Sequence, residues 1–115
     1  MEGRKREIHI FGDDLLEFIK KQDNGTRKKI MHVFDMMEFL SIVPDKFFKK
    51  LKGVENIYEI RVITHFKSIR ILGFMHKGNL IVLTHAFIKK SQKTPKTEIE
   101  RAIRIKAKYY EYQNN

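Results

Sequence analysis

The chain has 115 residues and a formal net charge of +10, from 24 Lys and Arg against 14 Asp and Glu. That length supports one domain, residues 1–115, with a single hydrophobic core, and excludes a second domain. The absence of cysteine excludes a disulfide framework, and no apolar run approaches the ~18 residues of a membrane span. The N-terminus lacks the apolar core of a signal peptide, so we expect a cytoplasmic protein with no membrane contact.

The positive charge is concentrated near the C-terminus. Residues 86–115 hold eight basic and three acidic side chains, a net charge of 8 − 3 = +5. Such clustering suits an anionic partner, usually nucleic acid, or an acidic protein surface. A solvated basic face that serves only solubility is the alternative that charge alone leaves open.

The first third of the chain predicts a strand followed by helices. Residues 6–11 alternate in polarity, which indicates a short strand. Residues 12–22 predict a helix with Asp13 as its N-cap and lysines in its last turn. Residues 26–40 place apolar side chains at spacings of three and four, which is typical of an amphipathic helix. A third, short basic helix is expected over residues 45–53, directly after a proline.

The remainder predicts a sheet and a closing helix. Three β-rich runs with a period of two, residues 56–63, 67–75 and 79–88, indicate an antiparallel meander. Thr97 as N-cap and Glu100 as the second member of a capping box then predict a C-terminal helix. The order of elements indicates an α+β domain with its helices packed on one face of a small antiparallel sheet.

Charged side chains fall on one side of the predicted meander. If Ile60 faces the helices, Glu59 and Arg61 lie on the open face, because side chains alternate along a strand. Hairpin pairing would bring Arg70 and Lys89 beside them and form a polar pocket with one carboxylate and several cations. The alternative is an exposed cross-strand charge pattern, with each pair contributing at most about 1 kcal/mol.

The histidines predict no metal site. The five histidines lack metal-ligand spacing, and the isolated glycines form no nucleotide-binding loop, so we expect neither a metal nor a cofactor. His85 lies on the last predicted strand, where a hydrogen-bonded structural histidine and a catalytic one are both consistent with the sequence.

Three segments carry a resemblance to a known family. LKGVENIYEIRV, IRILGF and LTHAFIKKSQKTPKTEIERA resemble the phage-derived branch of the RelE/HigB superfamily, the ribonuclease toxins of type II toxin–antitoxin systems. The similarity covers roughly residues 51–107, while residues 1–50 agree only in their strand–helix–helix plan. It implies a RelE-like α+β fold, with an N-terminal strand and helices on a small twisted antiparallel sheet and a C-terminal helix.

The resemblance also implies a function. Such toxins enter the ribosomal A site, cut mRNA and are silenced by a cognate antitoxin, here expected to be a helix-turn-helix protein. Cleavage by the RNA 2′-hydroxyl needs no metal, but it needs a proton acceptor, a proton donor and positive charge at the phosphate. The implied catalytic residues are Arg61, Arg70, His85 and Lys90, and the implied RNA-binding residues are Lys89, Lys93 and Lys96.

Individual roles follow from side-chain chemistry. Arg70 would stabilise the phosphate, since a guanidinium can hold two oxygens at once. Lys89, Lys90 and Lys93 would bind backbone phosphates or supply a proton, because a lysine crowded by other cations has a lowered pKa. His85 is the nearby side chain that ordinarily titrates close to neutral pH.

Two features depart from the family pattern. Some relatives carry a catalytic tyrosine at either end of the closing helix, whereas Tyr109 and Tyr110 lie far along it here. Either one folds back towards the pocket or this branch works without that residue. The second departure is Glu59, which stands where relatives outside this branch place another cation and so lowers the local positive charge.

A non-catalytic RNA-, ribosome- or protein-binding module on the same fold is the main alternative function. A DNA-binding regulator is a weaker one, because the sequence has no helix-turn-helix signature.

Overall fold

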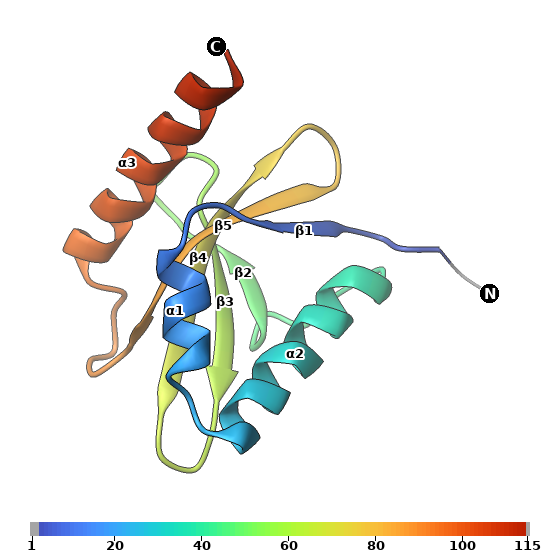
Figure 1. The fold of residues 1–115 in the computed structure, drawn as a ribbon, viewed down its shortest axis with the longest axis vertical. Helices are drawn as coiled ribbons and strands as arrows, with labels where there is room; N and C mark the ends of the chain where they lie inside the picture. Colours follow the sequence, from blue (N-terminus) through green and yellow to red (C-terminus); the bar gives the residue numbers. More distant parts are fainter. Residues whose placement is uncertain (1–2, 115) are drawn as a thin grey trace.

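A five-stranded sheet forms the centre of the protein, whose computed structural model describes residues 3–114 (Figure 1). The strands are β1 (Glu7–Ile10), β2 (Phe48–Lys50), β3 (Tyr58–Ile63), β4 (Ser68–His76) and β5 (Leu80–Ile88). They lie in the order β1-β5-β4-β3-β2, and the predicted meander of β3, β4 and β5 is confirmed. The sheet is mixed rather than wholly antiparallel, because β1 runs parallel to β5 at one edge.

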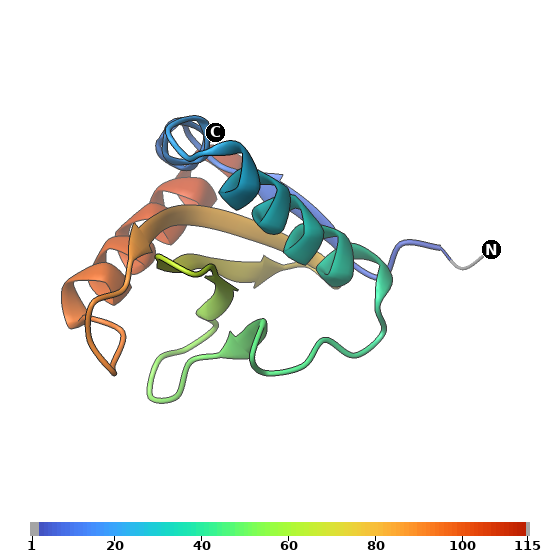
Figure 2. The same ribbon diagram turned by 90° about the horizontal axis from the view of Figure 1, so that it is seen from below.

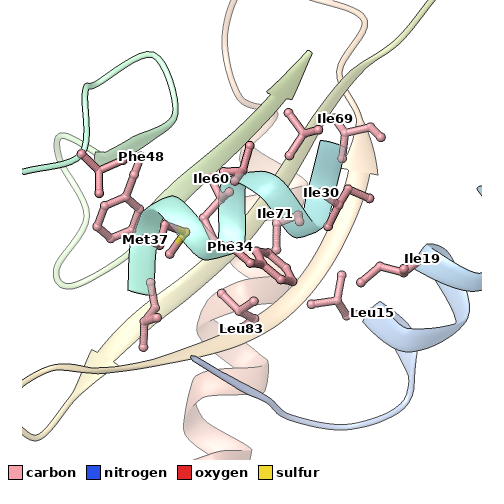
Figure 3. Packing of buried hydrophobic residues seen from close by; sticks show 14 residues of the cluster. Leu15, Ile19, Ile30, Phe34, Met37, Phe48, Ile60, Ile69, Ile71 and Leu83 are labelled. Atoms are coloured by element: carbon pink, nitrogen blue, oxygen red, sulfur yellow. The ribbon is translucent and has the colours of Figure 1, made fainter. Parts of the chain in front are cut away.

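Helices cover both faces of this sheet. They are α1 (Asp14–Lys20), α2 (Asn24–Phe39) and α3 (Lys96–Gln113). Figure 2 shows α1 and α2 over one face, where Leu15, Ile30 and Met37 pack against strand residues such as Ile60 and Ile71 (Figure 3). Each of these buried side chains contributes roughly 1.5–3 kcal/mol. None of the helices in residues 3–114 combines the length and apolar character that a membrane crossing requires.

The C-terminal helix packs on the opposite face, so the expectation that all helices share one face is wrong. Ala102 and Tyr109 of α3 are buried against Leu72, Phe74 and Val82 of the sheet. These strands are therefore apolar on both sides, and each apolar face of a sheet must be covered.

Two local predictions are also wrong. The segment 45–53 contains strand β2 instead of a helix, because Phe48 pairs opposite Ile60 on β3 and its backbone joins the ladder. The last helix begins at Lys96 with Pro95 as its N-cap. Thr97 therefore lies inside the helix and cannot cap it.

A β-bulge near the middle of the sheet sets the side-chain directions of β5. The register shifts between Leu72 and Gly73, and Thr84 is the extra residue on β5, with its hydroxyl donating to the Leu72 carbonyl at 3.1 Å. Such a bulge re-aims the side chains that follow it. Leu83 consequently faces α1 and α2, whereas Phe87 faces the α3 side that Arg70 shares.

Candidate functional site

A charged cluster lies on the α3 side of the sheet, across β3, β4 and the end of β5. The register places Arg61 opposite Arg70, and Arg70 opposite Phe87, two residues before Lys89. Glu59 and Arg61 alternate with Ile60 and Val62, which belong to the core under α1 and α2. The grouping predicted from strand alternation is therefore confirmed. Arg61 does not line the pocket that holds Arg70; it lines a different one, together with Lys29 and Val33 of α2.

Glu59 is the centre of this cluster. Its side chain is only 1% exposed, and its Oε1 lies 2.7 Å from Nε of Arg70. The same oxygen accepts a hydrogen bond from the Thr94 hydroxyl at 3.1 Å, while Oε2 lies 3.7 Å from Nη2 of Arg61. A buried charge needs partners of this kind, because it has lost its water. The arrangement is thus a buried ion pair, and the alternative of an exposed cross-strand charge pattern is wrong.

Arg70 presents its guanidinium to an open pocket. The residue is 7% exposed, and its Nη1 donates to the Ser68 hydroxyl at 2.9 Å and to the Ile69 carbonyl at 3.2 Å. None of these contacts uses Nη2. Burial lowers the pKa of Arg70 and Glu59 raises it, but an arginine remains a cation in a protein. The pocket has a volume of about 420 Å³ and is lined by Ser68, Arg70, Lys89, Lys90, Ser91 and Gln92.

Lys89 and Lys90 complete the cationic wall of that pocket. The Lys89 amide donates to the Ser68 carbonyl at 2.7 Å, which attaches this end of the loop to β4. Burial lowers the pKa of the Lys89 ammonium, and the positive charge of Arg70 lowers it further. Burial is the larger cause of this lowered pKa, and the crowding by other cations that the sequence suggested is the smaller one. Lys90 is exposed at the rim.

The loop between β5 and α3 carries the remaining lysines. Lys93 and Lys96 are exposed and lie outside the residues that line the pocket. Thr94 connects this loop to the buried Glu59, and the Ser91 hydroxyl donates to the Lys93 carbonyl at 3.0 Å. Thr94 was part of the recognised motif, but its contact with a carboxylate 35 residues earlier could not be inferred from local sequence.

The structure places His85 outside this cluster. Its imidazole is 1% exposed, with Nε2 3.1 Å from Glu98 Oε1 and Nδ1 3.0 Å from the Thr84 hydroxyl. Burial lowers the pKa of His85, and the nearby Arg101 lowers it further. His85 lines a different pocket, together with Asp14 and Arg101. These contacts are those of a hydrogen-bonded structural histidine.

Neither tyrosine folds back towards Arg70. Tyr109 is buried against Phe74, with ring centroids 5.4 Å apart, and the Tyr110 hydroxyl lies 3.2 Å from Nδ1 of His76. His76 is six positions beyond Arg70 on β4, or about 20 Å along the strand. The Arg70 pocket is therefore built without a tyrosine. Residues 3–114 also contain no group of three His, Cys, Asp or Glu side chains that could hold a metal ion.

Comparison with known proteins places the chain in a family. The model of the family described as "Phage derived protein Gp49-like (DUF891)" matches residues 17–107. The fold is similar to a chain of the archaeal RelE–RelB complex from Pyrococcus horikoshii OT3, with a TM-score of 0.57 and 15% identity over 73% of this chain and 94% of that one. No curated protein matches the sequence. The chain therefore belongs to the phage-derived Gp49-like family and has a RelE-like fold, which confirms the resemblance found in its motifs.

Proposed function

We propose that this protein is the toxin of a toxin–antitoxin pair and acts as a ribosome-dependent mRNA endoribonuclease. The observation that carries the proposal is the buried Glu59–Arg70 ion pair beside Lys89 at an open cationic pocket. Because Glu59 holds the Arg70 guanidinium in a fixed position at the pocket, Arg70 is suited to bind an anion that enters there. Membership of the Gp49-like family and the RelE-like fold support the same function.

The proposed reaction is cleavage of RNA by its own 2′-hydroxyl. The 2′-oxygen attacks the adjacent phosphorus and loses its proton, the bond from phosphorus to the 5′-oxygen breaks, and that oxygen gains a proton. The products are a 2′,3′-cyclic phosphate and a free 5′-hydroxyl. Because the nucleophile belongs to the RNA, the protein has only to move protons and stabilise the negative charge that builds on the phosphate.

The residues of the pocket, the neighbouring Arg61 and the loop before α3 divide these tasks. Arg70 stabilises the pentavalent phosphate, with Arg61 as a second cation held by the same carboxylate. Lys89 transfers a proton, because its lowered pKa lets its ammonium give up a proton more readily than an ordinary lysine. Lys90 at the rim is the second candidate for proton transfer. Lys93 and Lys96 bind flanking phosphates. His85, enclosed by its hydrogen bonds, is assigned a structural role.

The proposal includes two partners besides the message. The ribosome supplies the A site in which mRNA is presented, and a cytoplasmic location is part of the same proposal. The similar RelE chain comes from a complex with RelB, which supports an antitoxin partner for this protein as well. On the family resemblance, we propose a helix-turn-helix protein for that antitoxin.

Primer extension on messages from cells expressing the protein tests the proposal. We expect cuts within codons, and we expect these cuts to require active translation. They should disappear in Arg70→Ala and Lys89→Ala. They should persist in the control Arg104→Ala, which removes an exposed cation on α3. Circular dichroism shows whether each variant folds. Arg70→Ala leaves Glu59 buried without its closest partner, which can unfold the protein. Lys89→Ala therefore serves as a second test of the pocket. Intact messages alongside a folded, ribosome-binding wild-type protein would identify a non-catalytic binding module instead.

A further inference from the structure

Phe66 is an aromatic side chain that the core does not use. It lies in the turn between β3 and β4 and is 94% exposed, the highest value among the large hydrophobic side chains that the structure describes. Single exposed hydrophobic residues are common on protein surfaces and require no explanation by themselves. Two further features set Phe66 apart, namely the hydrogen-bonded turn that carries it and the cationic pocket beside that turn.

The turn holds Phe66 in a defined position. The Thr64 hydroxyl oxygen accepts hydrogen bonds from the backbone amides of Phe66 at 3.2 Å and Lys67 at 3.0 Å. The Thr64 amide donates to the Lys67 carbonyl at 2.9 Å and closes the turn. Lys67 Nζ donates to Oε1 of the buried Gln22 at 2.7 Å, which ties the turn to the connection between α1 and α2 beside it (Figure 1). The ring is thus displayed on an ordered turn.

This turn adjoins the cationic pocket. Ser68 follows Phe66 by two positions, or roughly 7 Å along an extended chain, and it both lines the pocket and accepts a hydrogen bond from Arg70. The Ser68 carbonyl also accepts from the Lys89 amide, so the turn and the lysine loop meet at the same end of the sheet. The exposed Phe66 is therefore only two residues away from a lining residue of a cationic pocket that suits a phosphate.

We propose that Phe66 stacks on a nucleobase of the RNA whose phosphate lies between Arg70 and Lys89. This inference rests on the proposed function. An aromatic ring beside cations that follow the backbone is the arrangement by which proteins hold single-stranded nucleic acid, since every base presents a π face. The His65 ring lies beside that of Phe66, with centroids 6.3 Å apart, and the adjoining pocket is polar and basic. These surroundings favour a polyanion over the apolar surface of a protein partner.

The absence of tryptophan from the sequence permits a site-specific reporter. Phe66→Trp places the only indole of the protein at the turn, and Phe39→Trp at the end of α2 is the matched control at another exposed phenylalanine. The probes are a ten-nucleotide single-stranded RNA and an abasic ribose-phosphate chain of equal length. The RNA should quench the fluorescence of Phe66→Trp, the abasic chain should leave it unchanged, and Phe39→Trp should respond to neither.

Binding affinities separate stacking from phosphate contact. Phe66→Ala should weaken binding of the RNA by about 5- to 150-fold, the range that loss of one base–aromatic stack produces. Phe66→Ala should leave binding of the abasic chain unchanged, whereas Arg70→Ala should weaken binding of the RNA and of the abasic chain.

If Phe66→Ala binds RNA like wild type while Arg70→Ala does not, the stacking proposal is wrong and the phosphate site stands. Wild-type protein that binds neither chain would refute stacking of Phe66 on single-stranded RNA, while primer extension on translated messages decides the proposed function separately. Self-association abolished by Phe66→Ala, with RNA affinity intact, would assign the ring to a protein contact.

Discussion

Replacing Glu59 by alanine should cost far more stability than loss of a surface charge. Glu59 is 1% exposed, and the side chain of its closest partner, Arg70, is 8% exposed. Removing one partner of a buried ion pair leaves the other charge desolvated and alone, at a cost of about 3–5 kcal/mol. At roughly 4 °C per kcal/mol for a domain of this size, the melting temperature should fall by about 12–20 °C. An exposed pair would cost at most about 1 kcal/mol, or roughly 4 °C.

Urea unfolding and thermal melts followed by circular dichroism measure this loss, with Glu111→Ala, an exposed acid on α3, as the control. The double variant Glu59→Leu/Arg70→Met should recover most of the stability lost in the single variant, because an apolar pair can replace a buried ion pair at little cost. It should nevertheless bind RNA poorly. If Glu59→Ala lost less than about 1 kcal/mol of unfolding free energy, the ion pair would not behave as a buried one. If the double variant were no more stable than Glu59→Ala, the idea that the pair is kept for function and not for stability would be refuted.

Three further predictions concern the bulge, the buried histidine and the lysine loop. Gly73→Ala should lower the free energy of unfolding by about 1–3 kcal/mol in urea, because its Cβ would lie 2.6 Å from a backbone carbonyl oxygen of β5, whereas Gly3→Ala, with open space around it, should change little. The pKa of His85 is lowered in the folded state, so the unfolded state takes up its proton first as pH falls through about 6.5, and stability should decrease there. Melts at pH 5.5 and 7.5 should differ more for wild type than for His85→Gln, and equal differences would contradict this. Lys90→Ala and Lys93→Ala should each reduce the slope of log affinity against log salt for single-stranded RNA by about 0.7, and unchanged slopes would show that these lysines contact no phosphate.

Strand alternation explains why much of the site was predictable from sequence. The period of two assigns Arg61 and Arg70 to the face opposite Ile60, and short hairpin turns limit the pairing registers to a few. The C-terminal motif likewise places Lys89 and Lys90 directly after the last strand. The side-chain alternation and the position of these lysines depend only on residues close together in the chain, so they can be predicted from the sequence.

The features that were missed depend on contacts between distant residues. Strand β2 forms because Phe48 finds a partner in Ile60, which outweighs the helical reading of its own segment. The hydrogen bond from Thr94 to Glu59 and the enclosure of His85 by Glu98 likewise join separate elements. No local pattern distinguishes an exposed glutamate from one that a fold will bury.

The most direct test uses a ribosome programmed with a message that carries a single 2′-deoxy nucleotide at the mapped cleavage position in the A site. We expect the all-ribose message to be cut to give a 2′,3′-cyclic phosphate and a 5′-hydroxyl, and we expect the single deoxy substitution to abolish the cut. Wild-type protein and Lys89→Ala should be compared on both messages, with cleavage of the all-ribose message lost in the variant. Cleavage that persists at the deoxy position, or that is unchanged in Lys89→Ala, would contradict an active site built on this pocket and the 2′-hydroxyl.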